Sequence, residues 1–273
     1  MIRRNIMLTG IRFSMYGATS VLLATVWLHI EKTDARINDR ISVHFFSVAF
    51  FSATSVAAIP LYLEERAVFI RERNNGLYGA GVYTIANTIV FIPYIFACAL
   101  FYSSIGYWAV GLKSNVWAFC RFVSYLFLSI YAAEAQALLV ATIIPDFIGA
   151  LACVGFLTGF WMAFQGFLVR TASLPRFWYY WAHWIDYQTY AFNLLVRNDF
   201  ESETFTCATL ANGSCHCSVP SSLIAKGQCA VTGADVLQSL GIPHFSPGLY
   251  AGILLAICFV YRLAFYLVLA FRK

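Results

Sequence analysis

Six stretches of this chain are long and apolar enough to cross a lipid bilayer as helices. A helix needs about 20 apolar residues to span the roughly 30 Å hydrocarbon core of a membrane. The stretches cover residues 13–30, 43–63, 80–106, 117–141, 147–169 and 248–270. Strands of a membrane barrel are shorter and alternate in polarity, whereas these runs do not alternate. We therefore predict an all-α membrane protein with six transmembrane helices.

Composition agrees with this prediction and narrows the possible functions. Of the 273 residues, 60% are hydrophobic and 11% are charged, whereas soluble domains are about 45–50% apolar. The sequence has no Gly-rich loop ending in Gly-Lys-Ser or Gly-Lys-Thr, no His-Glu-x-x-His and no Gly-x-Ser-x-Gly. It also has no basic patch for nucleic acid. We expect no catalytic residue, metal site or cofactor in this chain, which disfavours a lipid-modifying enzyme.

Cysteines mark the loop between the fifth and sixth predicted spans, residues 170–247. Four of the eight cysteines lie there: Cys207, Cys215, Cys217 and Cys229. The same loop holds the sequon Asn212-Gly213-Ser214, so we predict glycosylation of Asn212. Disulfides and glycans form on the oxidising side of a membrane, which puts both termini in the cytoplasm. Four cysteines allow three disulfide pairings, and the spacing does not choose among them.

An aromatic segment follows the fifth predicted span. Its rings recur every three residues, at Trp178, Trp181, Trp184 and Tyr187, which places them on one side of a helix. Aromatic side chains favour the membrane interface, so we predict a membrane-dipping helix in the outer leaflet. A packed aromatic cap on the bundle explains the periodicity equally well.

Two ionisable residues lie inside predicted spans, Glu134 and Arg262. A charge at the centre of a membrane helix costs roughly 2.5–3.5 kcal/mol on insertion scales, so such residues usually face a partner or a cavity. Both lie at similar depths from the cytoplasmic ends of their helices. We therefore predict a salt bridge between them or a shared polar relay.

The segment between the second and third predicted spans is densely charged and ends in a turn signal. Residues 64–78 read EERAVFIRERNNGLY, in which apolar Val68, Phe69 and Ile70 can anchor a short helix while the charges face a soluble partner. Gly76 lets the chain turn back toward the next span. A solvated loop is the alternative reading of the charges alone.

The order of residues in this segment, followed by Pro93-Tyr94, resembles the membrane domain of ABC transporter subfamily G, the white/brown and pleiotropic drug resistance type. A second similarity lies after the fifth span, at Leu174-Pro175, Trp178, Tyr190, Leu194 and Asn198-Asp199-Phe200. The likeness covers nearly the whole chain.

The resemblance implies that the charged segment is a coupling helix that docks on a nucleotide-binding domain carrying ATP and Mg²⁺. The coupling residues that it implies are Glu65, Arg66, Phe69, Arg71, Glu72 and Gly76. It also implies a second transmembrane domain as partner. We expect residues 1–12 to be the end of an interfacial connecting helix and residues 13–273 to form the membrane domain. The chain is then either a piece of a longer polypeptide that includes the nucleotide-binding domain or the partner of a separate ATPase.

The same resemblance implies a substrate cavity and a plug. The cavity positions are Phe45, Phe46, Ala53, Gly159 and Met162, and the plug positions are Phe167 and Leu168. The expected function is ATP-driven export of hydrophobic or amphipathic molecules such as lipids, sterols or xenobiotics, at the plasma membrane and in contact with its lipids. The alternative is a membrane scaffold or receptor that binds a protein through its outer loop.

Overall fold

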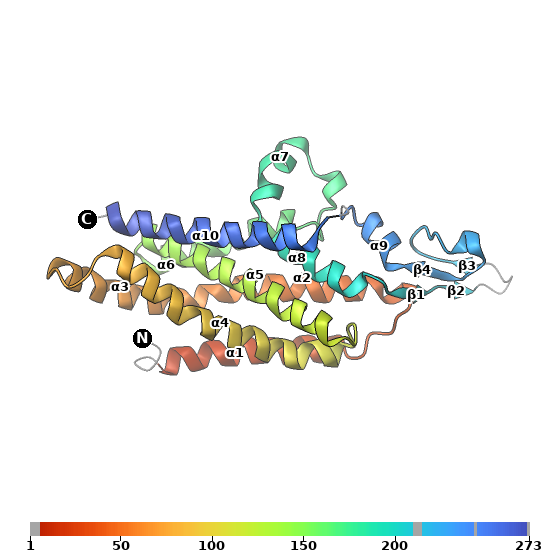
Figure 1. Ribbon diagram of the computed structural model, residues 1–273, viewed down its shortest axis with the longest axis horizontal. Helices are drawn as coiled ribbons and strands as arrows, with labels where there is room; N and C mark the ends of the chain where they lie inside the picture. Colours follow the sequence, from red (N-terminus) through yellow and green to blue (C-terminus); the bar gives the residue numbers. More distant parts are fainter. Residues whose placement is uncertain (1–5, 210–214, 243–244, 272–273) are drawn as a thin grey trace.

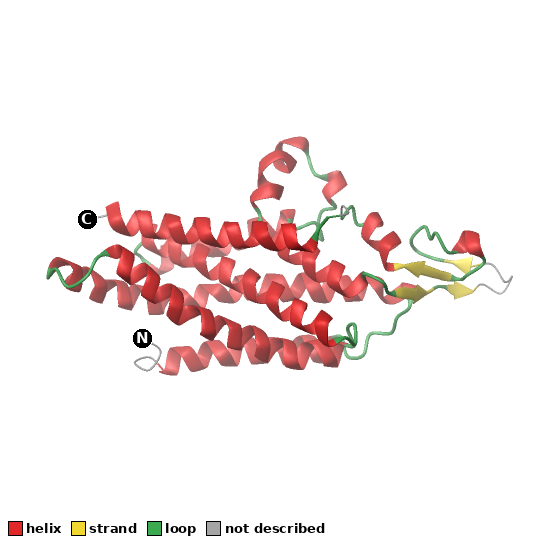
Figure 2. Cartoon of the chain, viewed as in Figure 1, coloured by secondary structure: helices red, strands yellow, loops and turns green. Residues whose placement is uncertain are grey.

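The computed structural model describes residues 6–209, 215–242 and 245–271 of the chain, which form an elongated helical bundle with a small domain at one end (Figures 1 and 2). The α-helices are α1 (Ile6–Val26), α2 (Ile37–Thr54), α3 (Ala58–Asn74), α4 (Ala80–Val110), α5 (Val116–Ile143), α6 (Phe147–Phe164), α7 (Arg176–Ile185), α8 (Tyr187–Phe200), α9 (Gly233–Ser239) and α10 (Pro247–Phe271). The strands are β1 (Thr204–Thr206), β2 (Ala208–Thr209), β3 (Cys215–His216) and β4 (Ala230–Thr232). Single 3-10 turns occur at η1 (Asp34–Arg36), η2 (Ser55–Ala57), η3 (Thr171–Ser173) and η4 (Ile224–Lys226).

Five helical stretches of the described residues are long and apolar enough to cross a membrane: Asp34–Asn74, Ala80–Val110, Val116–Ile143, Phe147–Phe164 and Pro247–Phe271. The predicted helical membrane fold is thereby confirmed. Helix α1 is not among the five, although it packs along α4 in the bundle (Figure 1). It begins and ends earlier than the predicted span 13–30, and its crossing of the membrane stays a prediction.

The charged segment after the second span continues that span. The stretch Asp34–Asn74 is 41 residues long and passes through the 3-10 turn η2, so the charges occupy the last turns of α3. After Asn74 the backbone reverses at Gly76, which has φ +73°. A residue without a Cβ adopts this left-handed conformation at little cost, and α4 can therefore start at Ala80.

Helix α5 forms the centre of the bundle. In its most apolar window 72% of residues are buried, against 28–33% in α4, α6 and α10. It packs against α2, α4, α8 and α10. The buried run Ala132, Ala133, Ala135 and Ala137 explains this position, because small side chains let neighbouring helices approach closely.

The predicted cysteine-bearing loop folds into a small disulfide-bonded domain. Strand β1 pairs with β4 and β2 pairs with β3, both antiparallel. The disulfides are Cys207–Cys217 and Cys215–Cys229, which selects one of the three possible pairings. These strands of two or three residues carry too little periodicity to be recognised in the sequence. The predicted glycosylation site Asn212 lies outside the described residues.

The aromatic segment forms two helices, because α7 ends at Ile185 and α8 starts at Tyr187. Helix α7 projects from the side of the bundle (Figure 1). It exposes Phe177, Tyr180 and Trp184. Tyr187, the last member of the predicted stripe, is instead buried in α8.

Candidate functional site

The end of α3 presents charge at the opposite end of the molecule from the disulfide-bonded domain (Figure 1). Glu64 and Arg71 are exposed, and Glu65 and Arg66 are half-buried. Phe69 is buried and its ring lies 4.5 Å from that of Tyr83 in α4. The apolar side of this helix end is therefore anchored to the bundle while Arg71 remains accessible.

Two further charges of this segment are bonded within the chain. The Tyr78 hydroxyl donates a hydrogen bond to the Glu72 carboxylate across the turn. Burial, followed by this hydrogen bond, raises the pKa of Tyr78 to about 12. Arg73 donates to the carbonyl oxygens of Leu269 (2.6 Å) and Ala270 (3.0 Å) in the last turn of α10. Local sequence patterns do not reveal this contact, because Arg73 and Leu269 lie 196 residues apart in the chain.

Helices α2 and α6 pack together and leave an apolar surface uncovered, which we call the α2–α6 face. It comprises the exposed residues Phe50, Ala53, Phe156 and Gly159. The predicted cavity residues Phe46 and Met162 are half-buried.

Phe45, the remaining predicted cavity residue, does not lie on the α2–α6 face. It is 3% exposed. Its ring stacks on Phe167 at 4.5 Å. Phe45 is therefore buried against Phe167 in this chain, and its place in a cavity stays a prediction.

The predicted plug follows α6 rather than belonging to it. Helix α6 ends at Phe164, and Gly166 has φ +101°, which turns the chain out of the helical direction. Phe167 is half-buried against Phe45, whereas Leu168 is 59% exposed. The two residues thus differ in accessibility.

The intramembrane charges have other partners than predicted. Glu134 forms an ion pair with Arg12 of α1, and both side chains are buried. Arg262 instead donates to Asn87 Oδ1 at 2.9 Å and lies 4.9 Å from the Tyr131 ring centre. The predicted direct salt bridge between Glu134 and Arg262 is wrong. Helix α1 begins at Ile6, so Arg12 belongs to the bundle and pairs with Glu134 instead. Arg262 and Glu134 are thus both buried and partnered within the bundle, by Asn87 and by Arg12.

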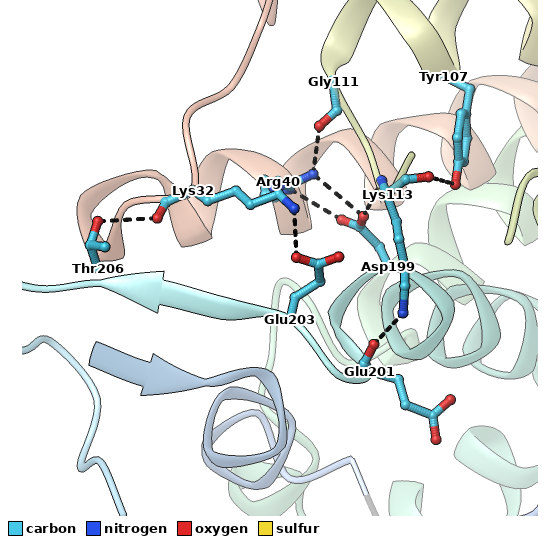
Figure 3. Close-up of polar contacts among 9 residues, drawn as sticks. All are labelled: Lys32, Arg40, Tyr107, Gly111, Lys113, Asp199, Glu201, Glu203 and Thr206. Carbon is cyan, nitrogen blue, oxygen red and sulfur yellow. Dashed lines mark hydrogen bonds and ion pairs between the residues drawn. The ribbon is translucent and has the colours of Figure 1, made fainter. Parts of the chain in front are cut away.

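Asp199, in the Asn198-Asp199-Phe200 motif at the end of α8, joins several segments at the end of the bundle next to the disulfide-bonded domain (Figure 3). Asp199 accepts hydrogen bonds from Arg40 Nε and from the Lys113 amide, both at 3.2 Å, and lies 3.2 Å from His44 Nε2. Burial alone raises the pKa of Asp199, but His44 and Arg40 hold this pKa below its ordinary value.

Further contacts reach the disulfide-bonded domain. Lys32 Nζ lies 2.6 Å from the Glu203 carboxylate, and the Thr206 hydroxyl donates to the Lys32 carbonyl at 3.3 Å (Figure 3). The loop between α1 and α2 is thereby tied to β1. Among the described residues, no group of three or more His, Cys, Asp or Glu side chains could hold a metal ion.

Comparison with known proteins agrees with this architecture. The family model described as ABC-2 type transporter matches residues 1–200. The chain belongs to this family. It is similar to ABC transporter G family member 23 of Arabidopsis thaliana, with 29% identity over 241 residues, which are 88% of this chain and 36% of that protein. It is also similar to ABC transporter G family member STR2 of Petunia hybrida, with 29% identity over 273 residues, or 99% of this chain and 35% of that protein.

A third relative, ABC transporter G family member 4 of Arabidopsis thaliana, is 28% identical over 269 residues, or 98% of this chain and 44% of that protein. The chain thus spans less than half the length of these relatives. It is the transmembrane domain of an ABC transporter of the G family and an integral, multi-pass membrane protein. Within that domain, the end of α3 and the α2–α6 face are the candidate functional sites.

Proposed function

We propose that this ABC-2 type domain is the membrane-spanning part of an ATP-driven exporter of hydrophobic or amphipathic molecules such as lipids, sterols or xenobiotics. The end of α3 contacts a nucleotide-binding domain, which binds ATP and Mg²⁺ outside this chain. A second membrane domain covers the α2–α6 face and completes a cavity. The protein resides in the plasma membrane, and both of its termini lie in the cytoplasm.

The observation that carries this proposal is the arrangement of α3. Its charged end is exposed at Glu64 and Arg71, whereas Phe69 anchors the same turns to α4. The disulfide-bonded domain lies at the far end of the bundle (Figure 1). A rigid helix fixed in this way can carry the movement of a soluble partner into the membrane.

The test uses the full-length transporter in inside-out vesicles, with a fluorescent lipid and a hydrophobic dye as probes. We expect ATP-dependent uptake by the wild-type protein. Arg71→Ala should lower the uptake per ATP hydrolysed while leaving surface delivery intact. Unchanged uptake and unchanged probe-stimulated ATPase activity in Arg71→Ala would contradict the coupling role. Absence of ATP-dependent uptake of either probe by correctly delivered wild-type protein would overturn the proposal of an exporter.

A further inference from the structure

We propose that Arg73 is a positioning residue that fastens the end of α3 to the last turn of α10, so that movement of α3 is passed to α10. This inference rests on the proposed function, in which the end of α3 contacts the ATPase. It adds a residue whose role differs from that of Arg71. Arg71 faces outward, whereas Arg73 faces another helix of the same chain.

The contact joins one guanidinium to two successive carbonyl groups. Arg73 Nη1 donates to the Leu269 oxygen at 2.6 Å, and Nη2 donates to the Ala270 oxygen at 3.0 Å. Both oxygens belong to the last described turn of α10. A hydrogen bond from a charged donor is stronger than one between neutral groups. A planar guanidinium can reach both oxygens at once, which a lysine ammonium does less well.

A second contact between α3 and α10 lies earlier in both helices. The rings of Tyr62 and Phe265 are 5.6 Å apart, and both residues are buried. Aromatic packing holds two helices together but permits them to slide and rotate more easily than directed hydrogen bonds do. Arg73 therefore supplies the contact that fixes the position of the α10 end relative to α3.

Helix α10 leads from this contact to the buried side chain of Arg262. Its buried residues follow a single face, with Cys258, Arg262, Phe265 and Leu269 spaced three or four positions apart. Arg262 on that face bonds Asn87 of α4 and lies 4.9 Å from the ring centre of Tyr131 in α5. A shift at Leu269 accordingly reaches the middle of the bundle through one continuous helix.

The experiment compares Arg73→Ala, Arg73→Lys and Arg71→Ala in the full-length transporter. Hydrogen–deuterium exchange of the α10 peptide containing Leu269 and Ala270 measures the contact without any need for transport. Arg71→Ala is a matched control for this measurement, because the Arg71 side chain donates a hydrogen bond to the Ala67 carbonyl of its own helix. Uptake of the fluorescent lipid per ATP hydrolysed then measures coupling.

We expect Arg73→Ala to speed exchange in the last turn of α10 by about fivefold, the effect of losing one hydrogen bond of typical net strength. Arg71→Ala should leave this exchange unchanged. Arg73→Ala should also lower lipid uptake per ATP by roughly threefold to tenfold, with the KM for ATP unaltered. Arg73→Lys should retain part of the slow exchange in the last turn of α10 and part of the lipid uptake per ATP.

Two results would overturn the inference. One is wild-type exchange of the α10 end in Arg73→Ala. The other is faster exchange with normal uptake per ATP, since the contact would then stabilise α10 without passing on movement. Failure of the proposed function is distinguishable from both, because the wild-type protein itself would then show no ATP-dependent uptake.

Discussion

Arg12 of α1 and Glu134 of α5 form an ion pair whose side chains are 3% and 0% exposed. The ring of Tyr94 lies 5.1 Å from the Arg12 guanidinium and shields it further. A buried charge that loses its partner is strongly destabilising, whereas replacing both charges by apolar groups is often neutral. This pair therefore fixes how α1 docks on the centre of the bundle.

The first prediction concerns that pair. Arg12→Met or Glu134→Leu alone should destabilise the protein by about 3–5 kcal/mol, because each leaves one buried charge uncompensated. The double variant Arg12→Met/Glu134→Leu should recover most of the loss. Thermal unfolding in detergent measures the effect, and Glu64→Gln, at an exposed position, serves as control. A double variant less stable than either single one would contradict the pairing.

The second prediction is a pH dependence at Asp199. Its folded-state pKa lies below the ordinary value of 3.8, with burial opposing this shift and His44 and Arg40 causing it. A carboxylate with a lowered pKa stabilises the fold above the unfolded pKa and loses that contribution as pH falls through the folded pKa. Asp199→Asn should therefore lower the unfolding temperature at pH 7.

The same substitution should matter less and less as pH falls below about 4, because the carboxyl of the unfolded chain is protonated there and that of the folded protein follows at its lower pKa. Unfolding temperatures of both proteins between pH 3 and pH 7 provide the measurement. A constant difference across this range would show that the charge of Asp199 does not contribute.

The third prediction is the disulfide pattern. Because Cys207 pairs with Cys217 and Cys215 with Cys229, Cys207→Ser should free the thiol of Cys217, and Cys229→Ser should free that of Cys215. Maleimide labelling followed by fragmentation of the labelled peptide locates the free thiol. Label on Cys215 in Cys207→Ser would establish a different pairing. Loss of either disulfide should lower the free energy of unfolding of the disulfide-bonded domain by about 2–4 kcal/mol.

Local patterns in the sequence predicted the helical spans, the charged helix end and the cysteine-bearing domain. Such local patterns do not predict contacts between segments that are distant in the sequence. Arg12 was assigned to a segment outside the bundle because hydropathy placed the start of the first span at residue 13, so its pairing with Glu134 was missed. The disulfide pairing depends on the register of β1 with β4, and the Arg73 contact depends on the position of the α10 end. Burial of Phe45 likewise follows from where Phe167 packs.

The fourth prediction tests the α2–α6 face. A Cβ added at Gly159 meets no atom within 4 Å, so Gly159→Phe places a large ring on the face without straining the fold of this chain. We expect an unchanged unfolding temperature of the isolated membrane domain, with ATP-dependent lipid uptake by the full-length transporter reduced by about tenfold, because the ring occupies space that substrate requires.

Gly252 is the matched control, since a Cβ there also meets no atom within 4 Å and the residue is exposed on α10 rather than on α2 or α6. Gly252→Phe adds the same ring to a surface outside the proposed cavity and should leave lipid uptake near the wild-type level. Equal losses in the two variants would mean that bulk on any exposed helix surface impairs the transporter. Only a selective loss in Gly159→Phe is expected if substrate passes along the α2–α6 face.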